Sequence, residues 1–169
     1  MSEITLKSKK TKNNKIVIRK TPNADSRTKK DNCTREEVHE DTLQHIKDVQ
    51  LGMNWLSTKV AQAGMLHDHT KIISDEYIDL VMNDLKDKAF LSTDWWFKHI
   101  HEERHHLNDN CPVDVTLIDV LEMITDCVMA GKGRKGHINS NTLKLIDPTL
   151  LERAYWNTVK LLDEKVIVK

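Results

Sequence analysis

The sequence predicts an all-α domain that follows a short basic N-terminal arm. From Thr34 onward, apolar residues recur at steps of three and four, which is the period of an α-helix. Residues that favour helix caps stand where these repeats begin. The 169 residues are 38% hydrophobic and contain no run of about 18 apolar residues. The composition therefore predicts one domain with its own core, at residues 33–169, and no membrane span.

Residues 1–32 are expected to form the arm. They carry ten lysines and arginines against three acids, with few apolar residues, which is typical of a mobile basic segment. A short β-hairpin is the alternative, with strands at 4–7 and 16–19 around a turn at 13–14 and a further strand at 166–168. The charge also leaves open contact with nucleic acid through this arm.

The first helix is expected to begin at Thr34, which forms a capping-box pattern with Glu37. Its apolar repeat runs to Val60, and Gly64 is expected to end or kink it. Residues 65–71 then form a short second helix or a last turn.

Two further helices are expected in the middle of the chain. Ser74 can cap one that extends through Phe90, and Thr93 or Ser92 can cap the next, which runs through His106. The tryptophans of this region, at 95 and 96, are expected to be packing anchors.

The last two helices have clear cap residues. Asp114 can cap a helix that stops at Gly131. Asp147 and Pro148 place a cap and a first-turn proline before the final helix, which continues to Leu162.

The nine histidines are unevenly distributed, with four between positions 99 and 106. On a helix, His101 and His105 share a face, which is a spacing by which two imidazoles can reach one metal ion. His39 flanks the apolar side of the first helix and can point inward. Asp126 stands at the edge of an apolar helix face, where a buried carboxylate would need a cation or hydrogen-bond donors. Either His99 or His101 can face the core.

The order of these residues resembles the HD-domain superfamily of metal-dependent phosphohydrolases: His39, His67-Asp68-x-x-Lys71, His101, His105-His106 and Asp126. The resemblance implies an HD-domain-like helical bundle. It also implies one or two divalent metal ions, and ligands of imidazole and carboxylate type suit manganese, iron, cobalt or zinc better than calcium. The primary ligands would be His39, His67, Asp68 and Asp126, and His101 with His105 or His106 would serve a second ion.

Residues 38–135 are also similar to an uncharacterised family of bacterial and phage proteins. The characteristic motifs of that family are His-Asp-x-x-Lys-Phe, a histidine cluster that ends in His-His, and Asp-Trp-x-Gly-Ala-Gly-Arg. Here Ile72 replaces the Phe and Cys127 replaces the Trp. The paired histidines are also similar to those of the HD-GYP phosphodiesterases. No Gly-Tyr-Pro follows them in this sequence, so a cyclic-dinucleotide substrate is not implied.

The segment 131–136 combines three glycines with three cations. As a loop, it could surround an anion with backbone N–H groups and with Lys132 and Arg134. The alternative is a helix C-cap followed by a turn. It lacks the spacing of a Walker loop, so ATPase chemistry is not indicated.

The expected function is hydrolysis of a phosphomonoester or phosphodiester, such as a nucleotide, by attack of a metal-bound hydroxide. Lys71, Lys132 and Arg134 would bind the phosphate. Glu76, Glu102 or Glu103 could protonate the leaving group, and Glu76 is the candidate carried forward. The alternatives are an HD-fold di-iron oxygenase and a non-enzymatic module that binds nucleic acid or a host protein. The absence of an export signal makes the cytoplasm the expected compartment, which is the host's if a phage encodes the chain.

Overall fold

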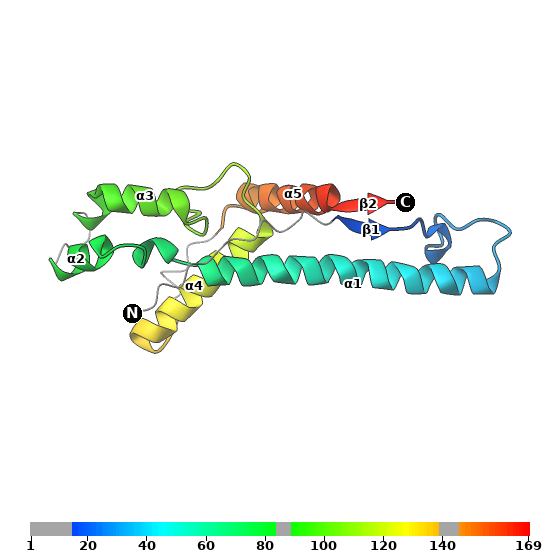
Figure 1. Cartoon of the computed structure of the whole chain (residues 1–169), viewed down its shortest axis with the longest axis horizontal. Coiled ribbons are helices and arrows are strands. Elements are labelled where there is room, and N and C mark those ends of the chain that lie inside the picture. The colour runs from blue at the N-terminus through cyan, green and yellow to red at the C-terminus, as the bar shows by residue number, and fades with distance from the viewer. Residues whose placement is uncertain (1–14, 84–88, 139–145) are drawn as a thin grey trace, which may run out of the picture. The chain divides into compact units, whose positions relative to one another are not determined.

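The chain is mostly helical, as expected for the all-α class (Figure 1). The structure, a computed structural model, describes residues 15–83, 89–138 and 146–169. The helices and strands of these ranges are β1 (Ile16–Ile18), α1 (Arg35–Leu66), α2 (Glu76–Met82), α3 (Asp94–Glu102), α4 (Leu117–Lys135), α5 (Pro148–Lys165) and β2 (Val166–Val168). Within these ranges, no helix is both long enough and apolar enough to cross a membrane.

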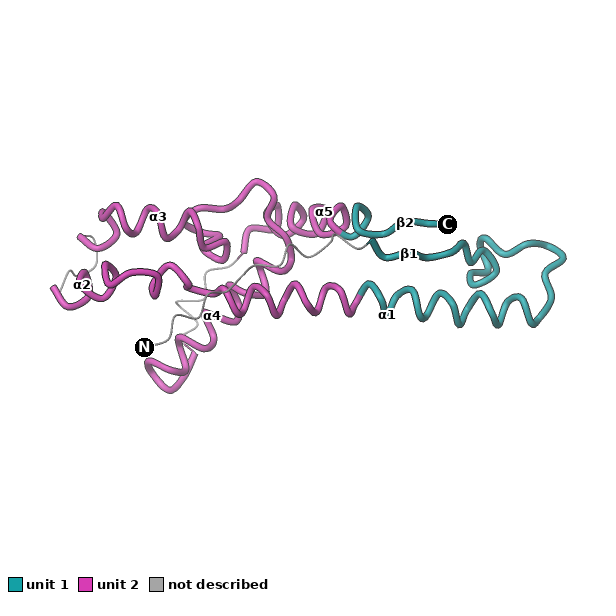
Figure 2. Tube along the Cα trace, in the orientation of Figure 1, with its two compact units in different colours: residues 1–52, 162–169 teal, residues 53–161 magenta. Residues whose placement is uncertain are grey.

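The chain divides into two compact units, which are coloured separately in Figure 2. The first comprises residues 1–52 with 162–169, and the second comprises residues 53–161. A boundary after Asn32 stays a prediction.

The first unit contains a two-stranded parallel sheet, in which Ile16 pairs with Val166 and Ile18 with Val168. The strand at 166–168 is therefore the partner of β1, while the expected strand at 4–7 and the turn at 13–14 lie outside the described residues. The buried carboxylate of Asp41 accepts a hydrogen bond from the Asn23 backbone N–H at 3.0 Å. It also pairs with Arg19 at 3.3 Å. These contacts tie the segment before α1 to the helix itself.

Helix α1 begins at the predicted capping box. The Glu37 N–H donates to the Thr34 hydroxyl at 3.1 Å, and the Thr34 N–H donates to the Glu37 carboxylate at 2.7 Å. Gly64 does not end the helix, which continues two residues further to Leu66. A single helical glycine costs only about 1 kcal/mol, which the rest of a long helix can absorb.

Helix α3 begins as predicted but ends early. The Thr93 hydroxyl accepts from the Trp96 N–H at 3.1 Å and caps the first turn. The last residue is Glu102, so His105 and His106 lie in the turn beyond the helix. The expectation that His101 and His105 share one helix face was therefore wrong.

Helix α4 is capped by Thr116 rather than by Asp114. Asp119 completes a capping box with Thr116, and Arg104 binds the carboxylate of Asp119 at 2.8 and 2.9 Å. Arg104 also reaches Asp114, at 3.1 Å. The core of this unit consists of Leu107, Val115, Val120, Met123 and Ala154. It packs α5 against α4 and the loop before it.

Candidate metal centre

A short turn and a 3₁₀ helix directly after α1 carry His67, Asp68 and Lys71. Asp68 adopts a left-handed backbone with φ of 55°, and it is the only non-glycine residue among the described ones with a positive φ. Its carboxylate accepts a hydrogen bond from the Lys71 ammonium group. Burial alone would raise the pKa of Asp68, but the hydrogen bond and charge of Lys71 outweigh it, so this pKa is lowered. Asp68 is therefore an anion at neutral pH.

Glu103, the residue after α3, holds this turn in place. Its buried carboxylate accepts from the backbone N–H of Thr70 at 2.9 Å and from that of Asp68 at 3.2 Å. It also accepts the Thr70 hydroxyl at 2.8 Å and contacts His69 Nδ1 at 2.9 Å. Every one of these contacts is with residues 68–70, which favours an organising role for Glu103 over proton donation.

The same hydroxyl of Thr70 fixes the orientation of His99. The Thr70 oxygen lies 2.6 Å from His99 Nδ1. Its proton is donated to Glu103, which can only accept, so His99 must donate from Nδ1. The lone pair of the neutral ring is then on Nε2, which lies 3.6 Å from Asp68 Oδ1. Trp95 stacks on this ring at 4.7 Å.

His99 is held in its neutral form. Its side chain is 1% exposed, and burial, together with the charges of His106 and Lys71, lowers its pKa to about 4. The Nε2 atoms of His99 and His106 are 2.8 Å apart. Two protonated nitrogens cannot approach so closely, so at least one of them presents a lone pair.

One oxygen of Asp68 is buried without a hydrogen-bond donor among the described residues. This atom, Oδ1, lies 3.6 Å from His99 Nε2 and 3.7 Å from His105 Nε2. These distances are too long for hydrogen bonds. Two ligand atoms of a tetrahedral ion with bonds of about 2.1 Å are about 3.4 Å apart. A divalent cation among these atoms would satisfy the oxygen at the spacing observed.

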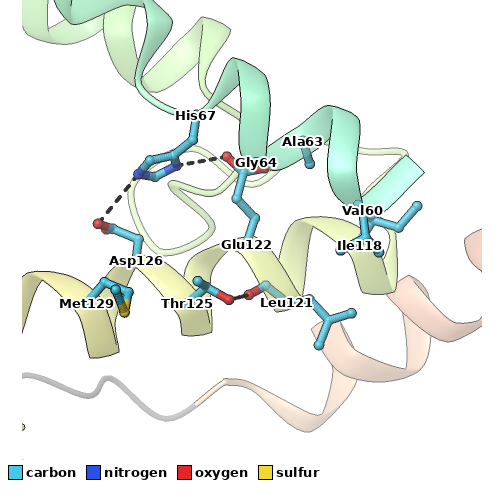
Figure 3. Close-up of a pocket in the computed structure, with 10 residues that line it drawn as sticks. All are labelled: Val60, Ala63, Gly64, His67, Ile118, Leu121, Glu122, Thr125, Asp126 and Met129. Atoms are coloured by element: carbon cyan, nitrogen blue, oxygen red, sulfur yellow. Dashed lines mark hydrogen bonds and ion pairs between the residues drawn. The ribbon is translucent and has the colours of Figure 1, made fainter. Parts of the chain in front are cut away.

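His67 faces the acidic side of α4 (Figure 3). Its Nδ1 lies 3.0 Å from Glu122 Oε1, and its Nε2 lies 3.6 Å from Asp126 Oδ1 and 3.5 Å from Asp68 Oδ2. Glu122 Oε1 also lies 3.2 Å from His105 Nδ1. This carboxylate therefore contacts both rings on the side away from Asp68.

Opposite charges in this group shift one another's pKa values. Burial alone would lower the pKa of His105, but the carboxylates of Glu122, Asp68 and Asp126 outweigh it and raise this pKa. Burial would raise the pKa of Glu122, but its contacts with His105 and His67 lower it. Among the described residues, three groups have ligand atoms within 4.8 Å of one another and could hold a metal ion: His67, His105 and Asp126; Asp68, His99 and His106; Glu103, His105 and Glu122. The first and the third share His105.

The structure brings together five of the seven expected ligands, namely His67, Asp68, His105, His106 and Asp126. It does not bring in His39, which is exposed in the first unit, or His101. His101 is exposed on α3 and turns its Nδ1 toward Asn110 at 3.2 Å. The α3 histidine that lies beside Asp68 is instead His99, two residues earlier on the same helix.

Glu122 belongs to the site but was not among the ligands expected from the sequence. It stands four residues before Asp126 on α4, so the two share a helix face. This spacing was the signal that could have identified it.

The expected phosphate-binding loop is the last part of a helix. Residues 131–135 continue α4, which ends at Gly136 with φ of 75°. The backbone N–H groups of this segment are therefore used inside the helix, and Lys132 and Arg134 are exposed on its final turns. Glu76 is exposed at the start of α2, and it lines a cavity of about 10 Å³ with Thr70 and His99.

Comparison with known proteins identifies no relative: no protein-family model matches the sequence, and no curated protein or solved structure matches it.

Proposed function

We propose that the second unit is an HD-type metal-dependent phosphohydrolase that binds one or two divalent transition ions. The observation that carries this proposal is the buried Asp68 Oδ1, which has no described hydrogen-bond donor and faces the Nε2 atoms of His99 and His105. A buried acceptor without a donor is costly, and an ion held by neutral imidazoles would remove that cost.

Two of the groups divide the ligands between two ions. His67, His105 and Asp126 would hold one, and Asp68, His99 and His106 the other. Mixed imidazole and carboxylate donors suit manganese, iron, cobalt or zinc better than calcium. The contacts of Thr70 with His99 and of Glu122 with His67 are of the kind that orient metal-binding histidines.

A bound divalent ion would lower the pKa of a coordinated water and screen the charge on the phosphoryl oxygens. The residues of the chain supply the rest. Lys71 keeps Asp68 ionised and places a positive charge beside any anion at the centre. Glu76 stays the proposed donor of a proton to the leaving group.

Elemental analysis tests the metal, and hydrolysis of p-nitrophenyl phosphate with Mn²⁺ tests the reaction. Asp68→Asn and His105→Gln should lose at least tenfold in metal affinity, because each removes a ligand atom from the centre. His101→Gln is the matched control and should bind metal as the wild type does. A wild-type protein that binds no transition metal and stays inert when supplied with it would refute the proposal.

Two alternatives have their own outcomes. Iron with an optical charge-transfer band, and no phosphatase activity, would favour a di-iron oxygenase. Contact with nucleic acid or a host protein through residues 1–32 is tested by deleting residues 1–14. Loss of that binding, in a trimmed protein that holds no metal, would favour the non-enzymatic module. This deletion leaves β1 and the contact of Asn23 with Asp41 intact. The proposed substrate range includes nucleotides, and the proposed compartment is the cytoplasm.

A further inference from the structure

We propose that an apolar cavity beside the candidate metal centre holds an uncharged aromatic ring of the substrate. This inference rests on the proposed function and narrows its substrate class to aryl esters carrying a single phosphate. Nucleoside polyphosphates would then be poor substrates.

The cavity has an apolar wall and a polar end (Figure 3). It has a volume of about 250 Å³ and lies between the C-terminal part of α1 and one face of α4. Its lining residues are Val60, Ala63, Gly64, Ile118, Leu121, Thr125 and Met129, with His67, Glu122 and Asp126 at the polar end. The last three belong to the candidate metal centre, so a molecule bound there would place its remaining part in the cavity.

The charge of the lining selects against a polyanion. The described residues that line the cavity include two carboxylates, Glu122 and Asp126, but neither a lysine nor an arginine. Lys132 and Arg134 are on the same helix, but they are exposed and do not line the cavity. Additional phosphates extending from the metal centre into this space would meet apolar side chains and neither a lysine nor an arginine, whereas an uncharged ring would bury apolar surface.

The volume is that of a small organic group. An apolar cavity of about 150 Å³ is enough to bind benzene. Sites for drug-sized ligands usually exceed about 300 Å³. The cavity is open to solvent, with Leu121 50% and Met129 65% exposed, and its volume of about 250 Å³ accommodates a substituted ring.

Gly64 offers a direct way to narrow this cavity. A Cβ atom at Gly64 would meet nothing within 4 Å, so a larger side chain can enter the open space. Leucine also favours a helix more than glycine does, so Gly64→Leu should fold. Gly133 is the matched control: it is also helical, a Cβ atom there would likewise meet nothing within 4 Å, and it does not line the cavity.

The test is NMR of the full chain labelled with ¹³C at the methionine methyl groups. Phenylphosphonate and methylphosphonate are added in the presence of Zn²⁺, and benzyl alcohol is added without metal. Phenylphosphonate and benzyl alcohol should shift the Met129 methyl signal and leave unchanged that of Met82, which does not line the cavity. In the wild type and in Gly133→Leu, phenylphosphonate should bind at least tenfold more tightly than methylphosphonate. In Gly64→Leu this ratio should fall toward one.

The outcomes separate this inference from the proposed function. If metal and both phosphonates bind equally well with no Met129 shift, the inference is overturned and the metal centre stands. If no metal binds but benzyl alcohol shifts Met129, the cavity stands as a ring-binding site and the phosphohydrolase proposal fails. A Met129 signal that moves with protein concentration alone would assign the cavity to a second copy of the chain and overturn the inference.

Discussion

Replacing Thr70 with valine should weaken metal binding without removing a ligand. The hydroxyl of Thr70 accepts a hydrogen bond from His99 Nδ1 at 2.6 Å and donates one to Glu103 at 2.8 Å. Valine has nearly the same volume but can make neither bond. The His99 ring is then left with a buried, unpaired N–H, or it moves its proton to Nε2 and loses the lone pair that faces Asp68.

The expected loss of metal affinity in Thr70→Val can be estimated for each of these two states of the His99 ring. An unpaired buried donor costs about 1 to 3 kcal/mol. Loss of a group that orients a metal-binding histidine commonly costs about 10- to 100-fold in metal affinity, which is about 1.4 to 2.7 kcal/mol. The turn itself should persist, because Glu103 still accepts the backbone N–H groups of Asp68 and Thr70.

Titration with Co²⁺, followed by its visible absorbance, measures the affinity. Thr70→Ser keeps the hydroxyl and should bind the ion nearly as well as the wild type. Thr42→Val is the matched control, since it removes a hydroxyl that bonds to the Val38 carbonyl within α1 at 2.7 Å. If folded Thr70→Val binds Co²⁺ as tightly as the wild type does, the hydroxyl does not orient His99 and this reasoning is wrong.

Three further predictions concern stability. Asp119→Asn should lower the free energy of unfolding by about 1.5 kcal/mol in urea denaturation, because it weakens the charged hydrogen bonds of a buried carboxylate to Arg104, which is partly exposed and keeps its contact with Asp114; an unchanged midpoint would contradict this. Val115→Ala removes two methyl groups from a side chain with no exposed surface and should cost about 2 kcal/mol in the same assay, whereas an unchanged midpoint would mean that the core is not packed as described. In the metal-free protein, His99 has a pKa lowered by burial to about 4 from 6.5, so between these pH values the unfolded chain binds a proton that the folded chain does not. The free energy of unfolding should therefore fall as the pH drops from 6.5 to 4, and His99→Gln should reduce this fall by up to about 3 kcal/mol; an unchanged pH profile would show that His99 is not held neutral.

The sequence located the start of three helices and misplaced two, because α2 begins after Asp75 rather than Ser74 and α4 begins after Thr116 rather than Asp114. The side chains of Thr34, Thr93 and Asp147 lie next to backbone N–H groups that need acceptors, and each accepts a hydrogen bond near the start of its helix. It was a poorer guide to where helices end. Gly64 was expected to end or kink its helix and Gly131 to end the later one, but both helices continue past these residues, because a helix tolerates an isolated glycine when the neighbouring turns are intact.

These end-points explain the errors in the site. Because α3 stops at Glu102, the spacing of His101 and His105 no longer describes a shared face. The ring that faces Asp68 is His99, which the sequence left as an alternative. Because α4 continues to Lys135, the expected anion loop is helical and its cations are exposed. Local spacing identified which types of residue form the site. Which of the neighbouring histidines lies in the site depends on tertiary contacts, which the sequence pattern does not show.

The left-handed backbone of Asp68 makes this position unusually demanding. Aspartate, asparagine and glycine visit that conformation more readily than other residues do, because their side chains are short or absent. Glutamate would keep the charge, yet it would strain the peptide and push its carboxylate one bond too far. Only aspartate both turns the chain here and delivers an anion at the reach observed, so a change that looks conservative on paper should be among the least tolerated in the molecule.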